Sequence, residues 1–130
     1  MHEDIDWTAL RYTAVNASKN SYSPYSNFSV GCAALVDDGR IVSGCNVENA
    51  SYGLTLCAEC NMLGELFATG GGKLIAFICV NAFEEVIMPC GRCRQLLQEH
   101  ASKSFIIETP KGMATMEDIL PLAFNSEDLD

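Results

Sequence analysis

Two stretches of the chain are the most informative: Thr55-Leu56-Cys57-Ala58-Glu59-Cys60 and, further on, Met88-Pro89-Cys90-Gly91-Arg92-Cys93-Arg94-Gln95. Each stretch enters a predicted helix, so its thiols lie near a helix N-terminus. The partial positive charge and free N–H groups there favour the thiolate form. Cys90 and Cys93 are three residues apart, a spacing that places both thiols on one helix face. Together with Cys57 they can bind one metal ion.

Three thiolates leave one open position on a tetrahedral zinc ion, and an open position distinguishes a catalytic zinc from a structural one. Glu59 follows the first thiolate by two residues and is not needed as a ligand, so it is free to transfer protons. This order of residues is typical of zinc-dependent nucleobase deaminases in their three-cysteine form. The sequence therefore predicts a zinc site at Cys57, Cys90 and Cys93 with Glu59 as the catalytic proton carrier.

Two alternatives use the same cysteines differently. Cys57, Cys60, Cys90 and Cys93 also fit a closed four-cysteine zinc site in a structural binding module. The long separation between the two pairs, which includes a predicted helix and strand, disfavours that module, and Glu59 would then have no role. A thiol hydrolase that uses Cys57 is the second alternative, but neither histidine is placed to serve it. Cys60 is expected to pack in the core.

Composition indicates one soluble domain over residues 1–130, with an acidic tail from about residue 125. The chain is 48% hydrophobic and has a net charge of −9, which repels phosphate backbones and argues against a nucleic-acid polymer as substrate. Because it has no apolar run of membrane-spanning length and an acidic, polar beginning, we expect no membrane contact and a cytoplasmic protein. The cysteines are then reduced, and three are expected to be core residues: Cys32, Cys45 and Cys79.

Hydrophobic periodicity and turn residues predict an alternation of helices and strands. The helices are predicted at residues 6–19, 57–69 and 90–100, and the strands at 28–36, 41–47, 74–80 and 105–107. A short strand at 112–116 and a helical turn at 116–120 follow. Leu63, Leu66 and Phe67 are expected to face the core. This order predicts an α/β fold, a three-layer α/β/α sandwich with a central mixed sheet of about five strands.

The whole pattern resembles the cytidine deaminase family, specifically its small, homotetrameric, three-cysteine branch. The resemblance runs from about residue 22 to residue 124 and rests on five motifs in order. They are Tyr22-Ser23-Pro24-Tyr25-Ser26-Asn27-Phe28, Gly44-Cys45-Asn46-Val47-Glu48-Asn49-Ala50, Cys57-Ala58-Glu59, Pro89-Cys90-Gly91-Arg92-Cys93-Arg94-Gln95 and Leu120-Pro121-Leu122-Ala123-Phe124.

The resemblance implies roles in substrate binding for five residues. Phe28 matches the aromatic residue that packs against the pyrimidine, and the backbone of Ala58 would lie beside the base. Asn46 and Glu48 match the pair that hydrogen-bonds the ribose hydroxyls, although a turn after a strand also explains them. Phe124 matches a C-terminal aromatic residue that reaches the site of a neighbouring subunit, so the sites of the homotetramer would be shared.

The implied activity is the zinc-dependent deamination of cytidine and deoxycytidine to uridine and deoxyuridine in pyrimidine salvage, with a small nucleoside as partner. Another aminated nucleoside, or free cytosine, is an alternative substrate, and the Asn46 and Glu48 pair favours a ribosylated one. The chain departs from the family at Cys60, where many relatives have an Arg that neutralises one thiolate. Arg92, Arg94 or the helix dipoles could take over that role.

Overall fold

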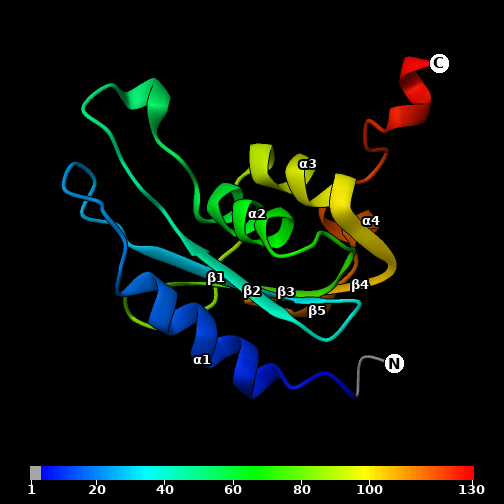
Figure 1. The fold of residues 1–130 in the computed structure, drawn as a ribbon, viewed down its shortest axis with the longest axis horizontal. Helices are drawn as coiled ribbons and strands as arrows, with labels where there is room; N and C mark the ends of the chain where they lie inside the picture. Colours follow the sequence, from blue (N-terminus) through cyan, green and yellow to red (C-terminus); the bar gives the residue numbers. More distant parts are fainter. Residues whose placement is uncertain (1–3) are drawn as a thin grey trace.

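The computed structural model describes residues 4–130 as a five-stranded sheet with helices on both faces (Figure 1). The strand order is β2-β1-β3-β4-β5, with β3 and β4 parallel and the other neighbouring pairs antiparallel. This confirms the predicted α/β/α fold with a mixed sheet. The elements are α1 (Trp7–Ser18), β1 (Val30–Val36), β2 (Ile41–Cys45), η2 (Tyr52–Leu54), α2 (Ala58–Ala68), β3 (Leu74–Asn81), α3 (Gly91–His100), β4 (Ala101–Thr109), β5 (Gly112–Ala114), α4 (Met116–Ile119) and η3 (Ser126–Leu129).

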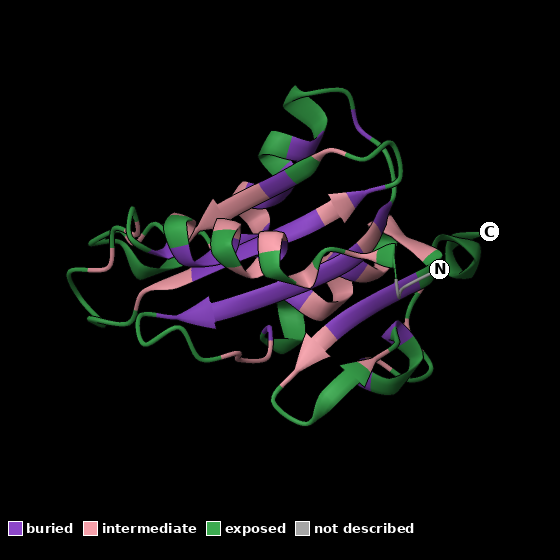
Figure 2. Cartoon of the chain, turned by 90° about the horizontal axis from the view of Figure 1, so that it is seen from below, coloured by how far each residue is buried: buried purple, intermediate pink, exposed green. Residues whose placement is uncertain are grey.

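The sheet separates two hydrophobic cores. Helix α1 covers one face, and α2, α3 and α4 lie over the other (Figure 1). Along β1, Cys32 and Ala34 belong to the core beneath α2, whereas Ala33 belongs to the core against α1. This alternation is the period of two that a strand covered on both faces requires. Strands β1 and β3 are buried for most of their length, as Figure 2 shows.

The two cysteine stretches start helices as predicted. Cys57 is the N-cap of α2 and Cys90 is the N-cap of α3, both with extended backbone. The loop that follows β2 returns to this point, because the N–H of Val47 donates to the carbonyl of Leu56, and the N–H of Leu56 donates back, each at 2.9 Å. The residues that end β2 are therefore held near the start of α2.

Phe67 and Cys45, both expected in the core, are not buried there. Phe67 is 56% exposed and makes an edge-on contact with His100, with ring centroids 5.1 Å apart. Leu63 and Leu66 face the core as expected, but Phe67 lies one helical step beyond Leu66 and is rotated toward solvent. Cys45 is half-buried rather than buried, because it ends the edge strand β2, whereas Cys32 and Cys79 are core residues.

Within residues 4–130, none of the helices combines the length and apolar character that crossing a bilayer requires. The acidic, polar beginning, from which we expect a cytoplasmic protein, includes residues 1–3, which lie outside the described residues.

Candidate active site

Cys57, Cys90 and Cys93 converge where the first turns of α2 and α3 meet. Their three Sγ atoms lie within 4.8 Å of one another. Two sulfurs on one tetrahedral zinc ion, each with a Zn–S bond of about 2.3 Å, are separated by roughly 3.8 Å. The three thiols therefore fit a zinc ion with small side-chain adjustments. This group of ligands does not include Cys60, which disfavours the closed four-cysteine site.

The helix N-termini affect the three thiols unequally. Partial desolvation acts to raise the pKa of Cys90, but the N–H groups of Cys93 and Arg92 outweigh it and lower this pKa. Desolvation raises the pKa of Cys57 and of Cys93, with nearby negative groups adding to the shift. Without a metal ion the cluster therefore retains protons, and zinc binding releases them as thiolates form.

Glu59 is buried beside the cysteines. Its side chain is only 4% exposed, and this desolvation raises the pKa of its carboxyl group, while its own backbone N–H and the Cys93 side chain oppose the shift. Glu59 occupies the first turn of α2, two residues after the Cys57 N-cap. A buried carboxyl group with a raised pKa can take up and release protons near neutral pH.

These groups open into a cavity of about 230 Å³, here called the cysteine cavity. Phe28 and Ala58, both expected to contact the base, line it, and so does Asn46. Phe28 is half exposed at the rim, and Ala58 is buried. The complete lining is Phe28, Val30, Asn46, Thr55, Cys57, Ala58, Glu59, Cys79, Ile87, Met88, Pro89 and Cys90. The lining therefore combines apolar side chains with the thiols of Cys57 and Cys90 and the carboxyl group of Glu59.

Asn46 is fixed by the backbone of the strand beside it. Its Oδ1 accepts a hydrogen bond from the N–H of Val30 at 2.9 Å, and its Nδ2 donates to the carbonyl of Phe28 at 2.9 Å. These bonds position Phe28 as well as Asn46, because they hold the start of β1 against the end of β2. The amide has a second N–H that can donate into the cysteine cavity.

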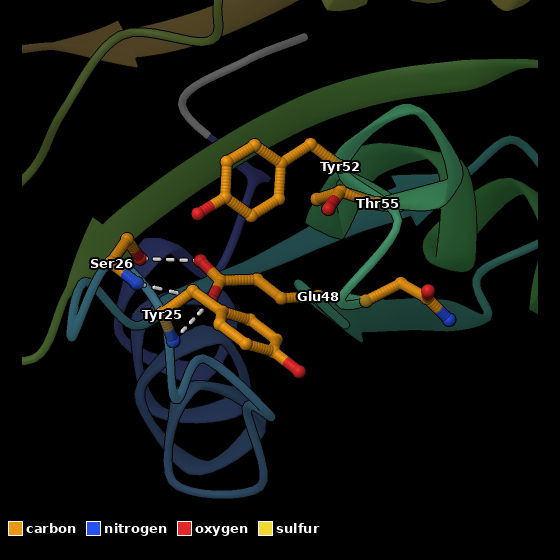
Figure 3. Close-up of a pocket in the computed structure, with 6 residues that line it drawn as sticks. Tyr25, Ser26, Glu48, Tyr52 and Thr55 are labelled. Carbon is orange, nitrogen blue, oxygen red and sulfur yellow. Dashed lines mark hydrogen bonds between the residues drawn. The ribbon is translucent and has the colours of Figure 1, made fainter.

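Glu48 does not line the cysteine cavity but the neighbouring one, here called the tyrosine cavity (Figure 3). This cavity of about 310 Å³ is lined by Tyr25, Ser26, Glu48, Asn49, Tyr52 and Thr55, and Thr55 also lines the cysteine cavity. The Glu48 carboxylate accepts hydrogen bonds from the N–H groups of Tyr25 and Ser26 at 2.9 and 3.2 Å, and from the Ser26 hydroxyl. The hydroxyl is the main cause of the lowered pKa of Glu48.

Two tyrosines of this second cavity were not predicted individually as site residues. The rings of Tyr25 and Tyr52 meet edge-on, with centroids 6.1 Å apart, and Figure 3 shows them on either side of Glu48. Both lie in stretches rich in turn-forming residues, and such loops often form the wall of a site. That loop composition was the available signal, but it does not specify which side chain points inward.

Arg92, rather than Arg94, is the cation beside the thiols. Cys60 and Cys57 raise the pKa of the Arg92 guanidinium, Cys60 more strongly than Cys57. Arg94 instead donates to the carbonyls of Pro89 at 2.9 Å and Ile119 at 3.1 Å. Cys60 lies half-buried near Arg92 and does not pack in the core, which corrects the expectation from the sequence.

Phe124 is not among the described residues that line the cysteine cavity of its own chain. Its carbonyl accepts a hydrogen bond from Gln95 Nε2 at 2.8 Å, which ties the segment to α3, while the residue is 55% exposed. The geometry therefore leaves its ring available to a neighbouring molecule.

Comparison with known proteins identifies the family. Residues 6–109 match the cytidine and deoxycytidylate deaminase zinc-binding region. A cytidine deaminase of Mycobacterium tuberculosis (strain H37Rv) is 55% identical over 126 residues, which cover 97% of this chain and 95% of that protein. A cytidine deaminase of Halalkalibacterium halodurans is 38% identical over 131 residues, with coverage of 97% and 99%.

A solved structure agrees with this assignment. The crystal structure of cytidine deaminase from Mycobacterium leprae matches the fold with a TM-score of 0.87 and 57% sequence identity, covering 90% of this chain and 98% of that chain. The family match includes both helix starts that carry the converging cysteines. The chain belongs to the zinc-binding cytidine and deoxycytidylate deaminase family.

Proposed function

We propose that the chain catalyses the hydrolytic deamination of cytidine and deoxycytidine, which yields uridine and deoxyuridine and releases ammonia. The observation that carries this proposal is the cluster of three thiols, of which Cys57 and Cys90 line one cavity together with the buried carboxyl group of Glu59. Cys57, Cys90 and Cys93 hold the zinc ion, and Glu59 is the catalytic acid and base. The relatives named above as cytidine deaminases support the choice of substrate.

Bound by three thiolates, zinc supplies a Lewis acid that activates a water molecule near neutral pH. Glu59 performs the proton transfers. Its carboxylate accepts a proton from the water that attacks C4 and passes it to ring N3. It then takes the proton of the new hydroxyl group and delivers it to the departing amine. Its raised pKa suits it to both directions of transfer.

The rest of the substrate is accommodated by the walls of the two cavities. Phe28 and Ala58 supply an apolar wall for the pyrimidine, and Asn46 and Glu48 lie where a sugar would extend toward the tyrosine cavity. Among residues 4–130, the lining of either cavity includes no Lys or Arg, so a phosphate group would find no cationic partner there. This favours an uncharged nucleoside over a nucleic-acid polymer.

The proposal includes a homotetramer with sites shared between subunits, acting in pyrimidine salvage in the cytoplasm. The described surface exposes many large apolar side chains for so small a chain, including Tyr12, Tyr52, Leu54, Phe67, Phe83, Leu122 and Phe124. Where such side chains lie together in one patch, they commonly mark a surface of association. Phe124 supports the sharing of sites, because its ring does not line the cysteine cavity of its own chain.

One experiment tests the proposal directly. The purified protein is assayed for zinc per chain, and its action on cytidine and deoxycytidine is followed by ultraviolet absorbance and ammonia release. We expect one zinc ion per chain and turnover of both nucleosides. Bound zinc without deamination of either nucleoside would contradict the proposed activity and favour a structural zinc module.

A further inference from the structure

Strand β2 lies at one edge of the sheet, and helix α2 packs against it. The N–H of Asn46 donates to the carbonyl of Val30, so this position and every second residue before it bond to β1. The backbone groups of Ser43 and Cys45 therefore point away from β1, toward the free edge. Backbone groups at a covered edge require partners from the element that covers it.

Two side chains of α2 supply these partners. Asn61 Nδ2 donates to the carbonyl of Cys45 at 2.7 Å, and the Glu65 carboxylate accepts from the N–H of Ser43 at 2.7 Å. Asn61 and Glu65 are four residues apart on the helix and thus share a face. Each forms one hydrogen bond between the same helix and the same strand, but only Asn61 does so in the first turn of α2, two residues after Glu59.

The backbones of the helix and strand touch at the same place. A Cβ atom on Gly44 would lie 2.4 Å from the carbonyl oxygen of Ala58 and 2.5 Å from the nitrogen of Met62. Ala58 lies between Cys57 and Glu59 in the sequence, so this contact and the Asn61 bond together determine where the first turn of α2 lies on β2.

We propose that Asn61 is a positioning residue for the deamination reaction, an inference that rests on the proposed function. Its bond to Cys45 joins the two walls of the cysteine cavity. Cys57 caps α2, Glu59 lies two residues before Asn61 in the same turn, and Asn46 directly follows Cys45 in the chain. Asn61 therefore holds Cys57 and Glu59 at a fixed distance from Asn46, on the wall that would face the sugar.

The residue type supports this assignment. Asn is a poor residue for a helix interior, because its side chain competes for backbone hydrogen bonds, so its presence in α2 calls for a compensating contact. A displacement of about 1 Å between reacting groups can reduce the rate by about 10²-fold. The loss of the Asn61 bond therefore affects catalysis beyond any loss of stability.

The test compares Asn61→Ala with the matched control Glu65→Ala. Both variants lose one bond between α2 and β2, and we expect both to unfold at a lower temperature than the wild type. Asn61→Ala should lower kcat per bound zinc by about 10-fold to 100-fold and change KM less, because the nucleoside still binds while its reacting carbon is misplaced. Glu65→Ala should keep kcat within about 2-fold of the wild-type value.

The proposal is overturned if Asn61→Ala keeps wild-type kcat per zinc, or if both variants lose kcat equally. Asn61→Asp provides a second variant, because it preserves the shape of the side chain and removes its N–H donors. It replaces Asn61→Ala in the comparison if the alanine variant does not fold.

A spectroscopic measurement separates this inference from the proposed function. Cobalt(II) replaces zinc, and its thiolate absorption bands report the geometry of the three sulfurs. We expect altered bands in Asn61→Ala and wild-type bands in Glu65→Ala. Identical bands in all three proteins would overturn the positioning role. If the wild type does not deaminate nucleosides, the proposed function fails, and the cobalt spectra still decide whether Asn61 positions Cys57.

Discussion

At the scale of single residues, Glu59 is the group on which the proposed chemistry depends. Glu59→Gln keeps the size of the side chain and its place in the first turn of α2, but the amide cannot carry protons. We expect turnover of cytidine to fall by at least about 10²-fold to 10⁴-fold, the usual contribution of a positioned acid and base. The measurement is kcat by ultraviolet absorbance, with zinc content measured on the same sample.

The zinc measurement is the control for that variant. Glu59 is not one of the three converging thiol residues, so Glu59→Gln should bind as much zinc as the wild type. If the variant has lost zinc, its lower kcat cannot be attributed to the loss of proton transfer. A zinc-loaded variant with wild-type kcat would remove Glu59 from the mechanism.

Arg92 permits a second prediction at this scale. Cys60 and Cys57 raise the pKa of its guanidinium, and by the same attraction its positive charge opposes the raised pKa of Cys57. Arg92→Ala should therefore weaken zinc binding at neutral pH, measured by competition with a chromophoric chelator. Lys103→Ala is the matched control, because it removes one positive charge from β4, away from the thiols. An equal loss of zinc affinity in the two variants would show that the net charge of the molecule matters and the position of Arg92 does not.

The spacing of Cys90 and Cys93 predicted that these two thiols share a helix face, and the order of residues typical of zinc deaminases added Cys57. The choice between Arg92 and Arg94 was not predictable from the sequence. The two residues are two positions apart in one helix and so point to different sides of it. Which side faces Cys57 depends on how α3 packs against α2, and that is a tertiary property.

At the scale of elements, close backbone contact between helix and strand permits a comparison of two glycines. A Cβ on Gly44 would clash with the carbonyl oxygen of Ala58 and the nitrogen of Met62 in α2. A Cβ on Gly31 would clash with the carbonyl oxygen of Ala14 and with the nitrogen and Cβ of Ser18 in α1. Gly44→Ala and Gly31→Ala should each destabilise the fold by about 1–3 kcal/mol through overpacking. Denaturant unfolding measures both losses.

Only one of the two glycines lies beside the site. Gly44→Ala should displace the first turn of α2, and with it Cys57 and Glu59, so zinc affinity and kcat should both fall. Gly31→Ala displaces α1, which carries none of the converging thiols, and should retain zinc and most of its activity. Retained zinc affinity in a folded Gly44→Ala variant would show that the strand does not set the position of the cysteines.

The sequence predicted the helices and central strands well, because their patterns are long and their caps are clear. Asp6, for example, accepts a hydrogen bond from the N–H of Ala9 at 3.0 Å and caps α1. The strand at 105–107 is longer in the structure, where β4 starts at Ala101. Its first residues include Ser102, Lys103 and Ser104, which show no apolar pattern. They lie between Ala101, which pairs with Leu74 of β3, and Ile106, which pairs with Ala76, where the register of the two strands shifts.

At the scale of the whole molecule, the C-terminal segment is held in place by its backbone and yet exposes its apolar side chains. Gln95 bonds to the carbonyl of Phe124, and Gln98 Nε2 donates to Asn125 Oδ1 at 2.8 Å. Leu122 is 97% exposed and Phe124 is 55% exposed. Figure 1 shows the chain end extending away from the sheet. A segment that is fixed in position with its apolar groups outward is suited to contact another subunit.

That geometry leads to a prediction about mixed oligomers. If Phe124 completes the site of a neighbouring subunit, each site needs Glu59 from one chain and Phe124 from another. Oligomers of Glu59→Gln alone should be inactive, and oligomers of Phe124→Ala alone should bind cytidine weakly, because a large apolar contact over the base is lost. Co-refolding the two variants should restore sites in which an intact Glu59 meets an intact neighbouring Phe124.

The expected result is that activity rises above the sum of the two parent preparations. Native mass spectrometry must show that hybrid oligomers have formed, since unmixed oligomers cannot complement each other. A mixture of the same variants that is combined without refolding serves as the control and should give only the averaged activity. If confirmed hybrids also give only this average, Phe124 does not serve a neighbouring site, and the exposed C-terminal segment has a different role in the assembly.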